Sequence, residues 1–454
     1  MKRKLTGMVL LVVLTGWQLA AQDSRGLTLD EAVRLSLQNS KQLKGSQARI
    51  EEATAALREA VEKKLPDAGV SGAYLRVNNP NLSLKSSNNG GSGGSGGNQG
   101  PIKVNQALYG MLNASLPIYQ GGKIRYGIES ARYLEQAARL DADADRDQVI
   151  QNTIEAFANL YKARKAVDLV KEDLEQARQR VRDFTNLEQN GLLARNDLLK
   201  AELQASNTEL ALLDADNNWK LANVNMDLLL GLPEQTLLEP DSASLAALPQ
   251  EKPLDEYVLA SQTSRKDRAS LDLRRKAAET GVKSTRSDYL PGFKLTGGYI
   301  AADIPNLLTI TNAVNIGVGV SYNLGSLWKT RARLEQAQAR ARQVSISESL
   351  LDDQIRLQVS QAYLNWLSSR KKIDVYAKAV EQATENYRIT RNKHENNLAT
   401  TADLLDADVA QLQANLNYVF AKADAVVAYN KLLEVAGIID QYNTIKPQST
   451  QTNQ

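Results

Sequence analysis

The sequence contains no cysteine and a single histidine, His394, among its 454 residues. Without cysteine there is no thiol nucleophile, no disulfide and no cysteine-ligated zinc, and one histidine leaves few routes to acid–base catalysis. Aromatic residues make up only 5% of the chain, whereas Ala, Leu, Gln, Glu and Arg recur throughout. This composition is typical of long helices. We therefore expect no enzyme, no cofactor and no bound metal.

The N-terminus has the layout of a secretory signal peptide. Three basic residues at positions 2–4 precede an apolar run, and small residues follow near Ala20 and Ala21. We expect residues 1–21 to be removed, although the run is also compatible with a retained membrane anchor. Cleavage leaves equal numbers of basic and acidic residues, which gives no indication of nucleic-acid binding. No later window has the ~18 to 20 apolar residues of a membrane-spanning helix, so crossing a membrane would require strands.

Four segments alternate between apolar and polar residues with a period of two, which predicts strands. The clearest apolar set is Val314, Ile316, Val318, Val320, Tyr322 and Leu324. We place the strands at about 67–78, 106–118, 291–302 and 313–324. Strands of this length cross a bilayer when tilted, and the pattern suits a porin-like wall. A four-stranded sheet packed on helices in a soluble domain is the alternative.

The sequence resembles itself at an offset of 206 residues. Matching pairs include Lys123 with Lys329, Asp197 with Asp403, and Gly231 with Gly437. We therefore expect two structural repeats, 22–253 and 254–437, followed by a polar tail, 438–454. The first repeat has an additional Gly/Ser/Asn tract, Ser86 to Gly100, which we interpret as the tip of a strand hairpin.

Apolar residues spaced by three and four predict long coiled-coil helices in both halves. One set is Val167, Val170, Leu174, Ala177, Val181 and Phe184, and its equivalents are Ile373, Tyr376, Val380, Ala383, Tyr387 and Thr390. After turns at 188–197 and 394–403 the pattern resumes, so each half forms a helical hairpin. A soluble coiled-coil protein would explain these helices but not the strands. Four strands cannot close into a barrel, because the smallest usual barrel has about eight. The strand count therefore requires oligomerisation.

The order of elements and several motifs resemble the TolC-like outer-membrane factors. The similar stretches are LTLDEAVRLSLQNSKQLK (Leu27 to Lys44), LPIYQGGKIRYGIESA (Leu116 to Ala131), NGLLARNDLLKAEL (Asn190 to Leu203) and the segment Asn396 to Gly437. The resemblance implies a mostly α-helical coiled-coil tunnel with transmembrane β-strands, four from each chain, in a 12-stranded trimeric barrel. Short helices, at about Thr28 to Lys64 with Arg195 to Leu230, would stack beside the long one.

The same resemblance implies the function and the partners. It predicts a homotrimeric duct in the outer membrane of a Gram-negative bacterium, in contact with outer-membrane lipid and belonging to an efflux or type I secretion system. The partners would be a periplasmic adaptor and an inner-membrane pump of the resistance-nodulation-division or ABC type. The alternative is a secreted periplasmic coiled-coil protein with a structural or adaptor role.

Three acidic residues are candidates for a periplasmic gate. Asp403 and Asp406 lie three apart on one helix face, and three copies would gather six carboxylates at the tunnel mouth. Asp197 matches a family position in the network that holds the entrance shut. An acidic first turn that complements the helix dipole explains Asp403 and Asp197 equally well.

The chain also departs from the family at this gate. Ala399 stands where the best-known member has a locking arginine, and His394 stands where that member has a tyrosine. Arg195 is a possible replacement for the cation, although a solvated arginine fits the sequence as well.

The two helical turns are candidate docking tips for the adaptor. Gly191, Leu192 and Leu193 form the first tip, and Asn397 and Leu398 form the second. Each combines apolar residues with a residue suited to positive φ. Capping of the helix ends, with apolar packing onto the partner helix, is the alternative role.

Overall fold

The computed structural model describes residues 25–78, 104–245, 252–305 and 307–439. The expected signal peptide, the tract Ser86 to Gly100 and most of the expected tail lie outside these ranges. The chain forms two compact units. The strand unit comprises Leu43–Asp145 and Arg265–Arg356, and the hairpin unit comprises the described parts of Met1–Gln42, Arg146–Ser264 and Leu357–Gln454. Each unit thus contains segments from both halves of the sequence.

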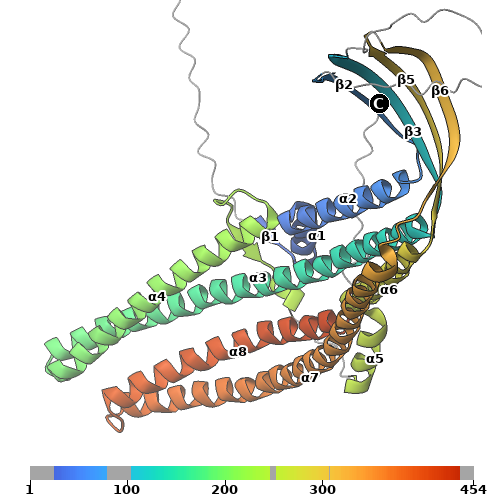
Figure 1. The fold of residues 1–454 in the computed structure, drawn as a ribbon. Coiled ribbons are helices and arrows are strands. Elements are labelled where there is room, and N and C mark those ends of the chain that lie inside the picture. Colours follow the sequence, from blue (N-terminus) through green and yellow to red (C-terminus); the bar gives the residue numbers. More distant parts are fainter. Residues whose placement is uncertain (1–24, 79–103, 246–251, 306, 440–454) are drawn as a thin grey trace, which may run out of the picture. The chain divides into compact units, whose positions relative to one another are not determined.

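The strand unit contains one antiparallel sheet of four strands in the order β2-β3-β5-β6, drawn as a curved layer in Figure 1. The strands are β2 (Asp67–Arg76), β3 (Gln106–Gln120), β5 (Gly292–Ile304) and β6 (Leu308–Ser321). β6 begins earlier than the expected residue 313, because its pairing with β5 continues past a register shift as far as Leu308 opposite Ile304.

One face of this sheet is apolar and exposed. Val70, Leu112, Tyr299 and Val314 lie opposite one another and form a single row across all four strands. The outer two of these, Val70 and Val314, are 82% and 78% exposed. The opposite face contains a parallel row of polar and glycine residues, Asn113, Gly298 and Asn315. The alternation predicted from the sequence is therefore present in the sheet, with its apolar side uncovered.

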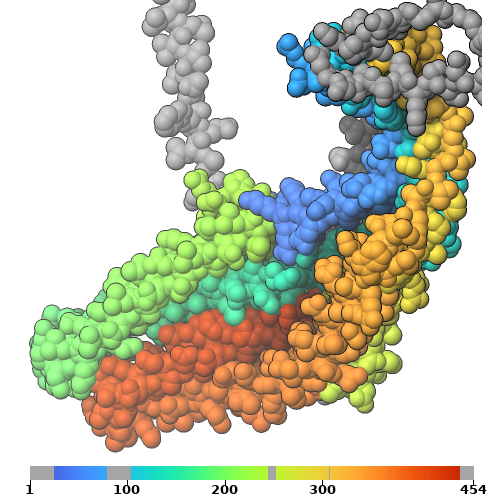
Figure 2. Space-filling view, viewed as in Figure 1, coloured from blue at the N-terminus to red at the C-terminus, as the bar shows by residue number. Residues whose placement is uncertain are grey.

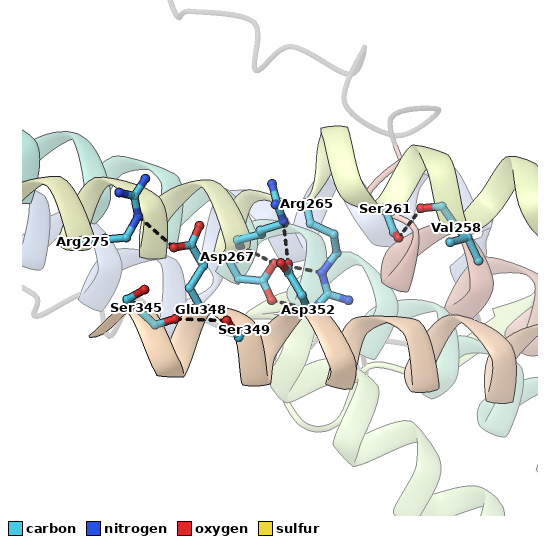
Figure 3. Close-up of polar contacts among 10 residues, drawn as sticks. Val258, Ser261, Arg265, Asp267, Arg275, Ser345, Glu348, Ser349 and Asp352 are labelled. Carbon is cyan, nitrogen blue, oxygen red and sulfur yellow. Dashed lines mark hydrogen bonds and ion pairs between the residues drawn. The ribbon is translucent and has the colours of Figure 1, made fainter. Parts of the chain in front are cut away.

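Below the sheet, the strand unit is built from α2 (Lys41–Glu62), α6 (Lys266–Arg286), η2 (Ser287–Tyr289) and the first parts of α3 (Lys123–Gln189) and α7 (Ser326–Glu395). Ion pairs connect α6 to α7. Arg268 Nε donates to Asp352 over 2.7 Å, and Arg275 Nε lies 2.9 Å from Glu348 (Figure 3). On the α3 side Ser270 is fully buried and donates to Asp141. Polar side chains thus fix α6 between its neighbours.

The hairpin unit contains the remaining parts of α3 and α7 and two shorter partner helices, α4 (Arg195–Leu230) and α8 (Thr401–Val435). β1 (Arg25–Leu27) pairs in parallel with β4 (Leu238–Pro240). The other elements are α1 (Leu29–Asn39), η1 (Ser242–Leu245) and α5 (Leu254–Ser264). Its largest fully buried side chains include Trp366, Tyr257 and Phe157. In the described ranges, no helix is both long and apolar enough to span a bilayer.

The expected continuous helix from Thr28 to Lys64 is interrupted. Ser40, with φ −53° and ψ 120°, leaves the helical region and separates α1 from α2. Arg265, with φ −66° and ψ 120°, separates α5 from α6 in the same way. Along the chain, both breaks lie within about two residues of the points where one unit ends and the other begins, Gln42 and Arg265.

Candidate functional site

The two hairpin turns have the same backbone geometry at the 206-residue offset. Gly191 and Asn397 both adopt positive φ, at 74° and 59°. In each turn the next residue donates its N–H to the carbonyl five residues earlier, at 2.8 Å from Leu192 and 2.7 Å from Leu398. Gly and Asn tolerate this left-handed conformation better than other residues, which explains their presence at the turns.

The apolar residues at these turns differ in exposure. Leu192 and Leu398 are 73% and 77% exposed. Leu193 instead is half-buried and packs on a core cluster made of Phe184, Leu198, Ala201 and Leu404. The two exposed leucines are therefore free for a partner, whereas Leu193 helps to hold the hairpins together.

A groove of about 1090 Å³ lies between the two hairpins near their tips, which appear as separate protrusions in Figure 2. We call it the inter-hairpin groove. His394 stacks on Phe184 with 5.5 Å between ring centroids, and its Nε2 lies 3.3 Å from the Thr401 hydroxyl. Ala399 lines the same groove. His394 therefore contacts both its own hairpin and the neighbouring one.

The three candidate gate acids have different surroundings. Asp197 lines the inter-hairpin groove and pairs with Lys200 at 3.1 Å. Asp403 and Asp406 are exposed and line a second groove beside α7 and α8. The structure therefore brings Asp403 and Asp406 together and separates Asp197 from them. Arg195, the candidate cation, is exposed and lies 4.0 Å from Glu188 within its own hairpin.

Asp403 caps its helix. Its carboxylate accepts the hydroxyl of Thr400 at 2.7 Å and the Thr400 backbone N–H at 2.9 Å, while its own N–H donates to Thr400 Oγ1. These hydrogen bonds hold the pKa of Asp403 below its usual value. The reciprocal arrangement is a capping box. Asp406 has no ion pair within the described part of the chain.

The sequence patterns did not identify a buried ion pair that joins the hairpins. Arg180 Nη1 on α3 donates to Asp408 Oδ2 on α8 over 2.8 Å, and Arg180 Nη2 donates to the Tyr387 hydroxyl on α7 over 3.2 Å. The side chains of Arg180 and Asp408 are only 9% and 4% exposed. Burial alone would lower the pKa of Arg180, but the hydrogen bond and charge of Asp408 outweigh it and raise that pKa.

A second carboxylate lies near this pair. Burial, reinforced by the charge of Asp408, raises the pKa of Asp173 on α3 from 3.8 to about 6, against the charge of Arg180 and a hydrogen bond from Thr208. Asp173, Ala177, Arg180 and Phe184 are spaced by four, three and four residues, which places them on one helix face. That spacing places Asp173 and Arg180 on one face of α3, but it does not predict that Asp408 on α8 lies beside them.

Comparison with known proteins identifies the family. The model of the family described as "Outer membrane efflux protein" matches residues 32–232 and 260–438. The chain therefore belongs to this family of outer-membrane proteins, and the function predicted from its resemblance, an outer-membrane channel of efflux or secretion systems, is confirmed.

Individual relatives agree with this assignment. The chain is 24% identical over 438 residues to the outer membrane efflux protein BepC of Brucella suis, covering 94% of this chain and 89% of BepC. It is also 24% identical over 333 residues to the alkaline protease secretion protein AprF of Pseudomonas aeruginosa, covering 70% and 66% of the two chains.

Solved structures show the same fold. The outer-membrane channel OprN gives a TM-score of 0.74 at 18% identity, covering 90% of this chain and 89% of OprN. The outer membrane protein VceC of Vibrio cholerae gives 0.73 at 20% identity, covering 90% and 96%.

Proposed function

We propose that three copies of the chain close their sheets into a twelve-stranded barrel in the outer membrane. The observation that carries this proposal is the exposed apolar row across β2, β3, β5 and β6. Lipid is a suitable neighbour for such a face. β2 and β6 are the edges of the sheet, and an unpaired edge in hydrocarbon costs several kcal/mol for each unsatisfied group. Pairing β6 of one copy with β2 of the next removes both edges.

The helical hairpins of the three copies then form the periplasmic tunnel of a tripartite efflux or type I secretion system. Its partners are a periplasmic adaptor and an inner-membrane pump of the resistance-nodulation-division or ABC type. The exposed Leu192 and Leu398 at the two tips support a docking role for these turns, together with Gly191 and Asn397, which set the turn geometry. Leu193 stabilises the first tip, because its side chain packs on the core cluster beside the turn.

The gate of this tunnel contains Asp403 and Asp406, which would form a ring of six carboxylates in a trimer. Their exposure on one groove supports this role. Asp403 also caps α8, so the capping and gating roles coincide in one side chain. Asp197 contributes from the inter-hairpin groove instead of the ring.

Membrane fractionation and bilayer recording test the proposal. The full chain should appear in outer-membrane fractions as a trimer and form pores in planar bilayers. A chain found only in the soluble periplasm, without pores, would instead support the alternative of a coiled-coil structural or adaptor protein.

The tips are tested separately. Leu192→Asp with Leu398→Asp should leave trimers in the membrane and abolish export, because docking would require the new charges to lose their hydration. Leu228→Asp, an exposed leucine on α4 away from the tips, is the matched control and should export normally. Normal export by the tip variant would remove these leucines from the docking site.

A further inference from the structure

A group of basic side chains lies at the end of the sheet where α3 and α7 begin, directly after β3 and β6 (Figure 1). The carboxylate of Asp288, in η2, accepts a hydrogen bond from Lys123 Nζ of α3 at 2.8 Å and lies 3.8 Å from Arg333 Nη1 of α7. Both cations remain more than half exposed. One carboxylate is thus shared by two cations that come from different helices.

Two further cations at this end of the sheet make no ion pair within the described ranges, Lys294 and Lys329. Lys329 precedes Arg333 by one helical turn on the same face of α7. Lys294 on β5 lies opposite Gly319 on β6, and a Cβ at Gly319 would lie 3.3 Å from the Lys294 Cγ and 3.4 Å from its Cε. The Lys294 side chain therefore lies across β6, the strand that leads into α7. We call Lys123, Lys294, Lys329 and Arg333 the basic cluster.

The basic cluster lies on the polar side of the sheet. Lys294 is four residues before Gly298, so it shares the face of the polar row described above. Lys123 and Lys294 line one groove of about 1040 Å³ on that face, together with Ser115 and Pro117 of β3. Because the apolar face contacts lipid in the proposed trimer, this groove opens into the interior of the duct.

The stability of the helices does not explain these cations. The helix dipole disfavours positive charges near a helix N-terminus, and α3 and α7 have no acidic residue in their first turn. By contrast, α1, α4, α5, α6 and α8 all have Asp or Glu there. Lys123 and Lys329 are equivalent at the 206-residue offset, so the exception occurs in both halves of the chain. A bound anion would offset this unfavourable placement.

The acidic residues that line the groove belong to other elements. Glu59 and Glu62 are on α2, and Asp67 is on β2. Glu59 is paired with Lys63 at 3.3 Å, and β3 separates β2 from β5. The basic cluster contains four cations to the one carboxylate of Asp288, which leaves a net charge of +3.

We propose that the basic cluster binds anionic groups, such as phosphate, sulfate or carboxylate, on the cargo that passes through the duct. This inference rests on the proposed function and deepens it by naming a class of cargo and a site for it. Lys294 and Lys329 supply free ammonium groups, and Lys123 and Arg333 add positive charge on either side of Asp288. Multivalent anions should bind most strongly, because each can contact several cations at once.

Pyrophosphate binding to the detergent-solubilised full chain tests the basic cluster. Lys294→Gln with Lys329→Gln removes the two unpaired cations and leaves the ion pairs of Asp288 intact. This variant should bind pyrophosphate at least about tenfold more weakly than the parent in isothermal titration at low salt. The affinity of the parent should fall as salt is added. Unchanged binding by the variant would overturn the proposal.

The matched control removes two exposed cations outside the groove, Arg125→Gln with Lys283→Gln. Arg125 lies about 200° around α3 from Lys123, and Lys283 lies about 200° around α6 from Gly281, which lines the groove. The control variant has the same net charge as the test variant and should bind pyrophosphate like the parent. An equal loss of affinity in both variants would show that only the overall charge matters, and would overturn the site.

Bilayer recordings locate the site in the pore. Pyrophosphate added from the barrel side should lower the conductance of the parent pore and leave that of Lys294→Gln with Lys329→Gln unchanged. Asp403→Asn with Asp406→Asn should keep the sensitivity of the parent, because both residues belong to the hairpin unit. Sensitivity that persists in the lysine variant, or disappears in the aspartate variant, would contradict the basic cluster as the site.

These measurements separate the anion site from the duct. Pores that conduct normally and do not respond to pyrophosphate would refute the site and leave the duct intact. A chain that forms neither trimers nor pores would refute the proposed function and, with it, the assignment of the anion to cargo. The titration would still measure anion binding in that case, because all four cations belong to one chain.

Discussion

The two helical hairpins share a turn geometry and differ in what covers them. Gly191 and Asn397 adopt the same positive φ, and α4 and α8 begin at equivalent residues, Arg195 and Thr401. The apolar side chains of the α3 coiled-coil pattern, such as Val170 and Leu174, are nevertheless buried. Their equivalents on α7, Tyr376 and Val380, are only half-buried. The contact within the chain contains the ion pair of Arg180 and Asp408. The two hairpins thus share a backbone geometry but differ in their polar side chains, since Asn386 and Glu202 stand at the positions equivalent to Arg180 and Asp408. The predictions below test that difference.

The largest expected effect comes from breaking the buried ion pair. Asp408→Ala leaves Arg180 buried without its carboxylate, which should cost about 3–5 kcal/mol of folding free energy. Glu202→Ala, the equivalent change on the other hairpin, should cost much less, because Glu202 is half-buried and makes no ion pair within the described ranges. Thermal unfolding of both variants in detergent measures the difference. Similar losses of folding free energy in the two variants would mean that Asp408 and Glu202 do not differ in their contribution to stability.

A smaller effect should come from Asp173. Its pKa of about 6 in the folded chain exceeds the unfolded value of 3.8, so the folded state binds the proton more tightly. Stability should therefore increase as pH falls from about 6 to 4, and the cost of the charged carboxylate should be fully present above pH 6. Asp173→Asn should stabilise the chain at pH 7.5 by about 1–2 kcal/mol, after allowance for solvent screening, and remove this pH dependence.

The control for Asp173 is its exposed neighbour Glu172. Glu172→Gln should retain the pH dependence of the parent, since its charge is the weakest of the contributions to the Asp173 pKa. Unfolding curves at pH 7.5 and 5 compare the three proteins. A pH dependence that survives in Asp173→Asn would assign it to another group.

The smallest effect concerns the starts of α4 and α8. Thr400 caps α8 through its side chain, whereas Ala194 at the equivalent position gives α4 no side-chain cap. Thr400→Ala should therefore cost about 1 kcal/mol, and Ala194→Thr should gain a comparable or smaller amount. Hydrogen exchange of the first turns of the two helices measures both changes. Equal protection of the first helical turns of α4 and α8 in the parent chain would contradict the expected difference in capping.

Local patterns predicted much of this fold. Period-two alternation located the four strands, and Gly191 and Asn397 located the two turns, because both signals depend on neighbouring residues. The start of β6 was predicted too late, since cross-strand pairing and not alternation extends it to Leu308. The breaks at Ser40 and Arg265 were missed because neither residue disfavours a helix strongly.

The candidate site was predictable only in part. Motifs similar to those of the family pointed to Asp403, Asp406 and the tips, and family membership is confirmed. The pair of Arg180 and Asp408 was missed because 228 residues separate its members, and local periodicity contains no information about such a pairing. The position of Asp197 in a different groove from Asp403 and Asp406 likewise depends on how the hairpins pack.

The most direct test of the proposed duct is a bilayer recording with multivalent cations added from the periplasmic side. If Asp403 and Asp406 form a ring of carboxylates at the tunnel mouth, these cations should block the wild-type pore. Changing both residues to Asn should abolish the block and the cation preference while the trimer persists. Unchanged block and selectivity in that double variant would contradict the proposed gate and restrict Asp403 to its role as a helix cap.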